Sequence, residues 1–174
     1  MQLLTGAIAA TGALLIWYSK PRWGLIVFLA ALLLYPQYLT VRLGVADFNV
    51  GRILVMVLVA RLILYPRERA YFKWSWMDTM VCAAWAGQTA AAATTTPLME
   101  MLERQGGTAF DMLLPYFAAR LVITSKDDFY FLVRGLAVVG VPLVLVGFYQ
   151  AWTGHNPYAA LRAHTAWGWE EQYM

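Results

Sequence analysis

The sequence predicts an all-α membrane protein, a polytopic bundle of about six spanning helices with a short interfacial helix near the C-terminus. Its 174 residues are 61% hydrophobic and only 13% charged, whereas about a quarter of the residues of a soluble domain are charged. So few charged side chains do not cover the surface of a soluble domain of this size. Long uncharged segments recur along the chain, and each approaches the length that crosses a lipid bilayer.

The first two helices are predicted over residues 2–19 and 23–41. Neither segment contains a charged residue, and a spanning helix needs about 20 mostly apolar residues at a rise of about 1.5 Å each. Lys20, Pro21 and Arg22 separate the two segments, and proline and charge favour a turn. The two helices are therefore expected to form a hairpin.

The third helix is predicted over residues 47–65. Its apolar stretch, 53–65, contains Arg61 and covers only about 20 Å of a bilayer core about 30 Å thick. The helix is therefore expected to begin earlier. Asp47 is a suitable N-cap, since its side chain accepts hydrogen bonds from the first turn of a helix that follows it.

A pattern of small residues distinguishes the fourth helix, which is predicted over residues 74–95. Small side chains stand at every fourth position: Thr79, Ala83, Gly87, Ala91 and Thr95. Residues with this spacing share one face of a helix, and small residues permit close helix contact. The pattern predicts a packing seam, with a substrate groove as the alternative. Ala83, Gly87 and Ala91 are the residues expected to contact a partner helix.

The last two spanning helices are predicted over residues 108–124 and 129–152. The first of these is the most polar of the six, because it carries Asp111 and Arg120. Residues 1–152 are thus expected to form one transmembrane domain.

Residues 153–174 are predicted to form an extracytoplasmic tail at the membrane interface. Asn156 and Pro157 are typical of the N-cap and first turn of a short helix. The aromatic residues that follow, such as Trp167 and Trp169, suit a helix that lies in the interface.

Basic residues predict the orientation, because they are enriched on the cytoplasmic side of membrane proteins. One side of the predicted hairpins carries Lys20, Arg22, Arg61, Arg67, Arg69, Lys73, Arg120, Lys126 and Arg134. The other side carries Arg42, Arg52, Arg104 and Arg162. The richer side is expected in the cytoplasm, which places both termini outside the cytoplasm.

Several other classes of protein are excluded by the sequence. The net charge is +3, but the basic residues form no stripe that would bind nucleic acid. A single cysteine, Cys82, excludes a disulfide framework. His155 and His164 are nine residues apart, on opposite faces of one helix, so they do not form a zinc pair. No cofactor or metal is expected, and no catalytic residue is identified.

The candidate site consists of arginines, because charges within or beside a membrane are costly and often functional. Arg61, Arg120 and Arg134 lie near predicted cytoplasmic ends, where long side chains can reach the interface and anchor the topology. We favour this role for them, but keep Arg120 as a candidate for binding a lipid phosphate.

Arg52 differs from these arginines because it lies at the extracytoplasmic end of the third helix, where the enrichment of basic residues does not explain it. Its planar guanidinium suits a phosphate or an anionic headgroup. An ion pair with Asp47 or Asp111 that orders the helices is an equally good explanation. Arg42 and Arg162 are candidates to join Arg52 in a basic cluster.

Three segments resemble the amino-terminal half of the bacterial O-antigen ligase and O-antigen polymerase family. They are DFNVGR at 47–52, PYFAAR at 115–120 and FYQAWTGHNP at 148–157, and they accompany the opening hairpin. Members of that family are all-helical proteins of the bacterial inner (plasma) membrane. They transfer glycans from an undecaprenyl-diphosphate carrier at its outer face.

The resemblance implies glycan transfer without a nucleotide sugar, in which arginines hold the diphosphate. The family continues into a large extracytoplasmic loop and further helices, whereas this sequence ends at Met174. We therefore expect a fragment that lacks the catalytic loop. The alternative is a small structural or regulatory membrane subunit that binds a partner through the fourth helix, or a transporter subunit.

Overall fold

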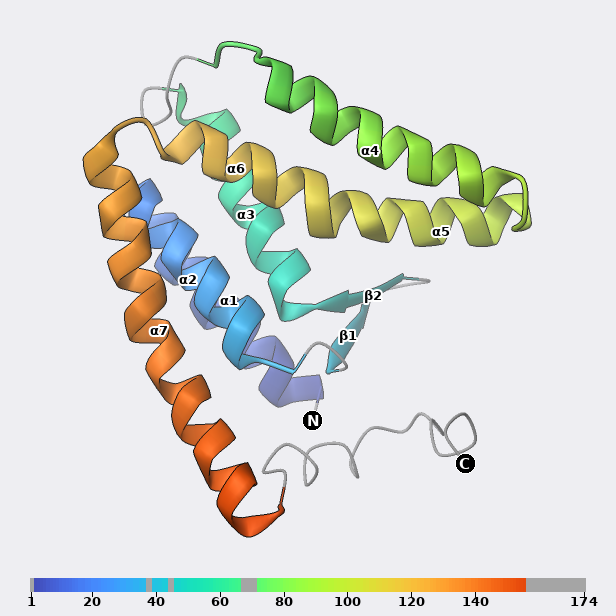
Figure 1. The fold of residues 1–174 in the computed structure, drawn as a ribbon. Helices are drawn as coiled ribbons and strands as arrows, with labels where there is room; N and C mark the ends of the chain where they lie inside the picture. Colours follow the sequence, from blue (N-terminus) through green and yellow to red (C-terminus); the bar gives the residue numbers. More distant parts are fainter. Residues whose placement is uncertain (1, 37–38, 44–45, 67–71, 156–174) are drawn as a thin grey trace.

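The computed structural model describes residues 2–36, 39–43, 46–66 and 72–155, and they form six helices and one short β-hairpin (Figure 1). The helices are α1 (Gln2–Tyr18), α2 (Pro21–Leu34), α3 (Val50–Leu64), α4 (Trp76–Ala93), one continuous helix made of α5 (Leu98–Thr108), the π-helical turn η2 (Ala109–Leu113) and α6 (Leu114–Val122), and α7 (Lys126–Thr153). The predicted helical class is confirmed at this level.

Helices α1, α2 and α3 pack against one another, and α7 lies along α2 (Figure 1). Helix α4 and the α5–η2–α6 helix run side by side, and the α6 end of this helix crosses the bundle where it contacts α2 and α3. The strands β1 (Thr40–Leu43) and β2 (Ala46–Asn49) lie at the end of the bundle where α3 begins. Helix α1 begins at this same end and α7 finishes there.

The core lies where α1, α2 and α3 meet, and α6 covers part of it. Ile16, Phe28 and Leu58 are at most 2% exposed. Ala118 and Val122 of α6 are also buried against this cluster, and their spacing of four residues places them on one helix face. The core therefore fixes α6 onto α3.

Helix α7 is the one described helix that is long and apolar enough to cross a membrane. It has 28 residues, its most apolar window has a mean hydropathy of 2.2, and none of that window is buried within the structure. At about 1.5 Å per residue it is about 42 Å long, more than the thickness of a bilayer core. Helices α1 and α2 are apolar but shorter. The sequence predicts six spans, whereas one described helix meets the criteria of both length and apolar composition.

Helix α2 ends at Leu34, before the predicted limit of residue 41. Pro36 explains this end, because the residue before a proline avoids helical geometry, and Tyr35 is extended with φ −97° and ψ 129°. The β-hairpin that follows was not predicted. Its antiparallel register pairs Thr40 with Asn49 and Arg42 with Asp47.

Helix α3 begins at Val50, and its N-cap is Asn49. The Asn49 side chain accepts a 2.8 Å hydrogen bond from the backbone N–H of Arg52. The prediction that Asp47 caps this helix is wrong, because Asp47 lies in β2, two residues before the cap. Asparagine and aspartate are equally good caps, so composition alone did not distinguish them.

The helix predicted over 108–124 begins at Leu98 and ends at Val122. The prediction omits its first turns because they carry polar residues, whereas spanning segments are recognised by their apolar composition. Helix α7 begins at Lys126, where Ser125 and Asp128 exchange hydrogen bonds of 3.1 Å in a capping box. It ends at Thr153, and its C-cap is Gly154, whose φ of +68° suits that position. The interfacial helix predicted at Asn156 lies outside the described residues.

Close packing joins α7 to α2. The rings of Trp23 and Phe131 are 4.8 Å apart with edge-to-face geometry, and the Arg22 guanidinium lies 5.0 Å from the Phe131 ring centre. One turn further along α7, a Cβ atom on Gly135 would lie 2.4 Å from Cδ1 of Ile26. Gly135 is therefore required for this approach of the two helices.

The small-residue face of α4 is exposed in the described structure. Its five members, Thr79, Ala83, Gly87, Ala91 and Thr95, are all exposed, and a Cβ atom on Gly87 would contact nothing within 4 Å. The prediction of a packing seam is wrong for contacts among the described residues, where α4 packs instead through the face that carries Asp78 and Trp85. A partner helix at Ala83, Gly87 and Ala91 stays a prediction.

Candidate functional site

Two groups of charged residues attach the α5–η2–α6 helix to its neighbours. The Asp78 cluster consists of Ser75, Asp78, Tyr116 and Arg120, and it joins the start of α4 to α6. The Arg52 pair consists of Arg52 and Asp111, and it joins α3 to η2. The two groups differ in the burial of the carboxylate, because Asp78 is fully buried whereas the Asp111 side chain is 50% exposed.

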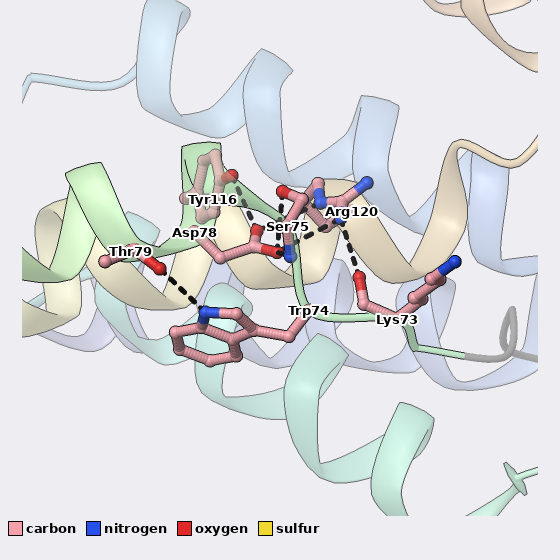
Figure 2. Close-up of polar contacts among 7 residues, drawn as sticks. All are labelled: Lys73, Trp74, Ser75, Asp78, Thr79, Tyr116 and Arg120. Carbon is pink, nitrogen blue, oxygen red and sulfur yellow. Dashed lines mark hydrogen bonds and ion pairs between the residues drawn. The ribbon is translucent and has the colours of Figure 1, made fainter.

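Figure 2 shows the Asp78 cluster, in which the carboxylate of Asp78 accepts five hydrogen bonds. The Tyr116 hydroxyl donates to Oδ1 at 2.7 Å, and Arg120 donates from Nε to Oδ1 and from Nη2 to Oδ2, both at 3.1 Å. The backbone N–H and the hydroxyl of Ser75 donate to Oδ2 at 2.6 and 2.9 Å. Asp78 is fully buried, so its oxygens are engaged within the protein.

These donors hold the pKa of Asp78 well below its usual range. The largest cause is the hydrogen bond from Arg120, while burial acts in the opposite direction. Arg120 also donates from Nη2 to the backbone oxygen of Lys73 at 3.1 Å. The cluster therefore acts as a structural connection that keeps α4 and α6 together.

The Arg52 pair is a two-point ion pair that is partly open to solvent. Nε of Arg52 donates to Oδ1 of Asp111 at 2.9 Å, and Nη2 donates to Oδ2 at 2.6 Å. The Arg52 side chain is 27% exposed and that of Asp111 is 50% exposed. Nη1 of Arg52 makes no hydrogen bond with any residue that the structure describes. The ion pair with Asp111 is thus the arrangement observed, one of the two explanations that the sequence left open.

Two local features accompany the contact between Arg52 and Asp111. The first is the π-helical turn η2, in which Asp111 lies, and such turns often occur at functional sites. The second is a glycine beside the guanidinium. Gly107, one turn before Asp111, leaves room for the guanidinium, because a Cβ atom there would lie 2.9 Å from Nη2 of Arg52. A larger residue at position 107 would therefore displace Arg52.

Arg61, which the sequence predicts to anchor the topology, is buried between α1 and α3. It is 6% exposed, and its Nη1 donates hydrogen bonds to the backbone oxygens of Ile16 and Ser19. Both oxygens lie at the end of α1, where helix carbonyl groups need partners and attract positive charge. Arg61 thus stabilises the junction of α1 and α3.

The other predicted binding residues are not brought together within the described structure. Arg120 belongs to the Asp78 cluster, near the end of the bundle opposite the β-hairpin. Arg42 lies in β1, where its backbone pairs with Asp47, and its side chain is not described. Arg162 lies outside the described residues, so a basic cluster of Arg42, Arg52 and Arg162 stays a prediction.

Sequence reasoning missed the Asp78 cluster, although two signals for it were present. Ser75 and Asp78 have the spacing of a capping box. Tyr116 and Arg120 are four residues apart, which places them on the same face of a helix. The first motif places an acceptor, Asp78, on one helix, and the second places two donors, Tyr116 and Arg120, on another. Neither motif predicts that the two helices are in contact.

Comparison with protein families, with curated proteins and with solved structures finds no match for this chain.

Proposed function

We propose that this chain is part of an integral membrane protein that holds a lipid-linked anion at the end of the helix bundle where α3 begins. The ligand class is an undecaprenyl-diphosphate-linked glycan, as the resemblance to the O-antigen ligase and polymerase family implies. In this proposal the described residues bind the diphosphate, and groups outside the described residues carry out glycan transfer.

The exposed apolar surface of α7 supports a membrane location. Val138 is 72% exposed, Leu145 63% and Phe148 71%, and together they belong to a helix long enough to cross the bilayer. Water is a poor solvent for such a surface, whereas lipid chains are a good one. In this proposal α7 crosses the bacterial inner membrane, with α1, α2 and α3 beside it.

The distribution of basic residues supports an orientation. Lys20 lies between α1 and α2, Arg22 lies in the first turn of α2, Arg61 lies in the last turn of α3, and Lys126 begins α7. These positions share the end of the bundle away from the β-hairpin (Figure 1). The enrichment of basic residues in the cytoplasm places this end inside and the hairpin end outside.

One observation carries the binding proposal, namely that Arg52 presents a fixed and partly exposed guanidinium at the proposed outer end. Asp111 orients the guanidinium through Nε and Nη2, and Nη1 offers the first contact to an approaching oxyanion. The N-terminus of α3 adds a favourable electrostatic contribution, because unpaired N–H groups there attract negative charge. A guanidinium also matches the oxygen spacing of a phosphate group.

Substitution of Arg52 tests the proposal. A lysine keeps the charge but loses the planar geometry, and a glutamine loses both. Affinity for undecaprenyl diphosphate is therefore expected to fall in the order arginine, lysine, glutamine, with a loss of about tenfold for Arg52→Gln. Native mass spectrometry of the purified variants in detergent measures the bound fraction.

Arg104→Gln is the matched control. Arg104 is an exposed arginine on α5, so its substitution removes the same charge without touching the Arg52 pair, and binding is expected to stay unchanged. Equal binding by wild type and by a folded Arg52→Gln variant would contradict the proposal. A parallel loss in Arg104→Gln would show that only net charge matters.

A further inference from the structure

The Arg52 pair differs from the Asp78 cluster in how easily its carboxylate can be replaced. Asp111 is 50% exposed, and Arg52 provides its only hydrogen bonds among the described residues. Asp78 is fully buried and has four groups of donors around it. An exposed ion pair contributes little to stability, so separating Arg52 from Asp111 costs little.

The geometry of the pair is also that of a phosphate complex. A carboxylate and a phosphate both accept two parallel hydrogen bonds from one guanidinium, and Asp111 accepts them from Nε and Nη2. The same two N–H groups also bind an external oxyanion most strongly, because they form two parallel, charge-assisted hydrogen bonds with it. Asp111 and such a ligand therefore compete for one place.

We propose that Asp111 is an internal competitor that occupies Arg52 until a diphosphate displaces it. This inference rests on the proposed function of Arg52 and adds the regulation of that site. The diphosphate can belong to a lipid carrier or be free in solution, since the chemistry that Arg52 recognises is the same in both.

Displacement has a structural consequence. The Arg52 pair is the ion pair that links α3 to η2, and η2 is the π-helical turn within an otherwise α-helical segment. Such a turn is a rare interruption of the regular α-helical hydrogen-bond pattern. Loss of the link is therefore expected to increase hydrogen exchange of the amides from Gly107 to Leu113.

The test compares wild type with Asp111→Asn and with Asp111→Ala. Removing the competitor is expected to strengthen binding of a polyprenyl diphosphate in detergent by about fivefold, the size of an exposed ion pair. Inorganic diphosphate is titrated in a second arm. Stronger binding in both arms assigns the effect to the diphosphate itself, and stronger binding in the lipid arm alone assigns it to the lipid-linked form.

Glu103→Gln is the matched control, because Glu103 is an exposed carboxylate on α5 that lies outside the Arg52 pair. The Glu103→Gln variant is expected to bind diphosphate with the affinity of wild type. A gain in affinity as large as that of Asp111→Asn would mean that the change in net charge alone strengthens binding. The variant Arg52→Gln/Asp111→Asn is expected to lose the gain.

The outcomes separate the two proposals. If Arg52→Gln binds as well as wild type, the proposed function fails. If Arg52→Gln weakens binding but the folded Asp111 variants bind no better than wild type, Asp111 is not a competitor and the proposed function stands. Ligand binding to wild type without greater exchange in residues 107–113 also contradicts displacement.

Discussion

Replacing Gly135 by leucine is expected to lower the free energy of unfolding by about 2 kcal/mol, as overpacking of a close contact does. A Cβ atom at this position would lie 2.4 Å from Cδ1 and 2.9 Å from Cγ1 of Ile26. Ile26 is buried, and its β-branched side chain has few alternative rotamers. Helix α7 must therefore move away from α2. Thermal unfolding in detergent measures the loss.

Gly140→Leu is the control on the same helix. A Cβ atom on Gly140 meets nothing within 4 Å, so the change is expected to leave stability unchanged or to raise it slightly, since leucine favours a helix more than glycine does. Adding Ile26→Ala to Gly135→Leu is expected to restore part of the stability. Equal unfolding temperatures for the two leucine variants would contradict the packing of α7 on α2.

Replacing Asp78 by asparagine is expected to have the largest effect among the polar residues, lowering the unfolding temperature on the order of 10 °C. The amide brings two N–H donors to a place where Tyr116, Arg120 and Ser75 already donate. It also leaves the Arg120 guanidinium without its carboxylate partner. Asp111→Asn, in the exposed pair, is expected to cost no more than about 3 °C.

The effect of Asp78 has a defined pH dependence. Its pKa is lowered in the folded protein, chiefly by Arg120, so the folded state favours the charged form. This contribution is fully present above the ordinary aspartate pKa of about 3.9 and is lost as the pH falls below it. The gap in unfolding temperature between wild type and Asp78→Asn is therefore expected to be constant near neutral pH and to narrow in acid. A constant gap down to pH values of about 2 would contradict this assignment.

The sequence predicted the number of helices and the general position of each one, because apolar composition and turn residues act locally. Two helix limits differ from the predicted ones, each for a local reason. Pro36 ends α2 early, although the segment around it is apolar. The polar residues of α5 concealed a helix that begins at Leu98.

The candidate site was predicted in part. The cost of a charge within a membrane span points to Arg52, and Asp111 is one of the two ion-pair partners that the sequence offers for it. The buried position of Arg61 could not be predicted, because it depends on carbonyl groups of Ile16 and Ser19 in a different helix. The position of α4 beside α6 likewise depends on tertiary contacts, among them the ion pair of Asp78 and Arg120.

The proposed membrane location requires that α7 cross a membrane with its first residue inside. Single cysteines at Asp127 and Thr153, near opposite ends of α7, test this directly in a protein with Cys82 replaced by serine. In intact cells the cysteine at position 153 is expected to react with a membrane-impermeant maleimide. The cysteine at position 127 is expected to react only after the membrane is permeabilised. Equal labelling of both positions in intact cells, or labelling of position 127 alone, would contradict the account.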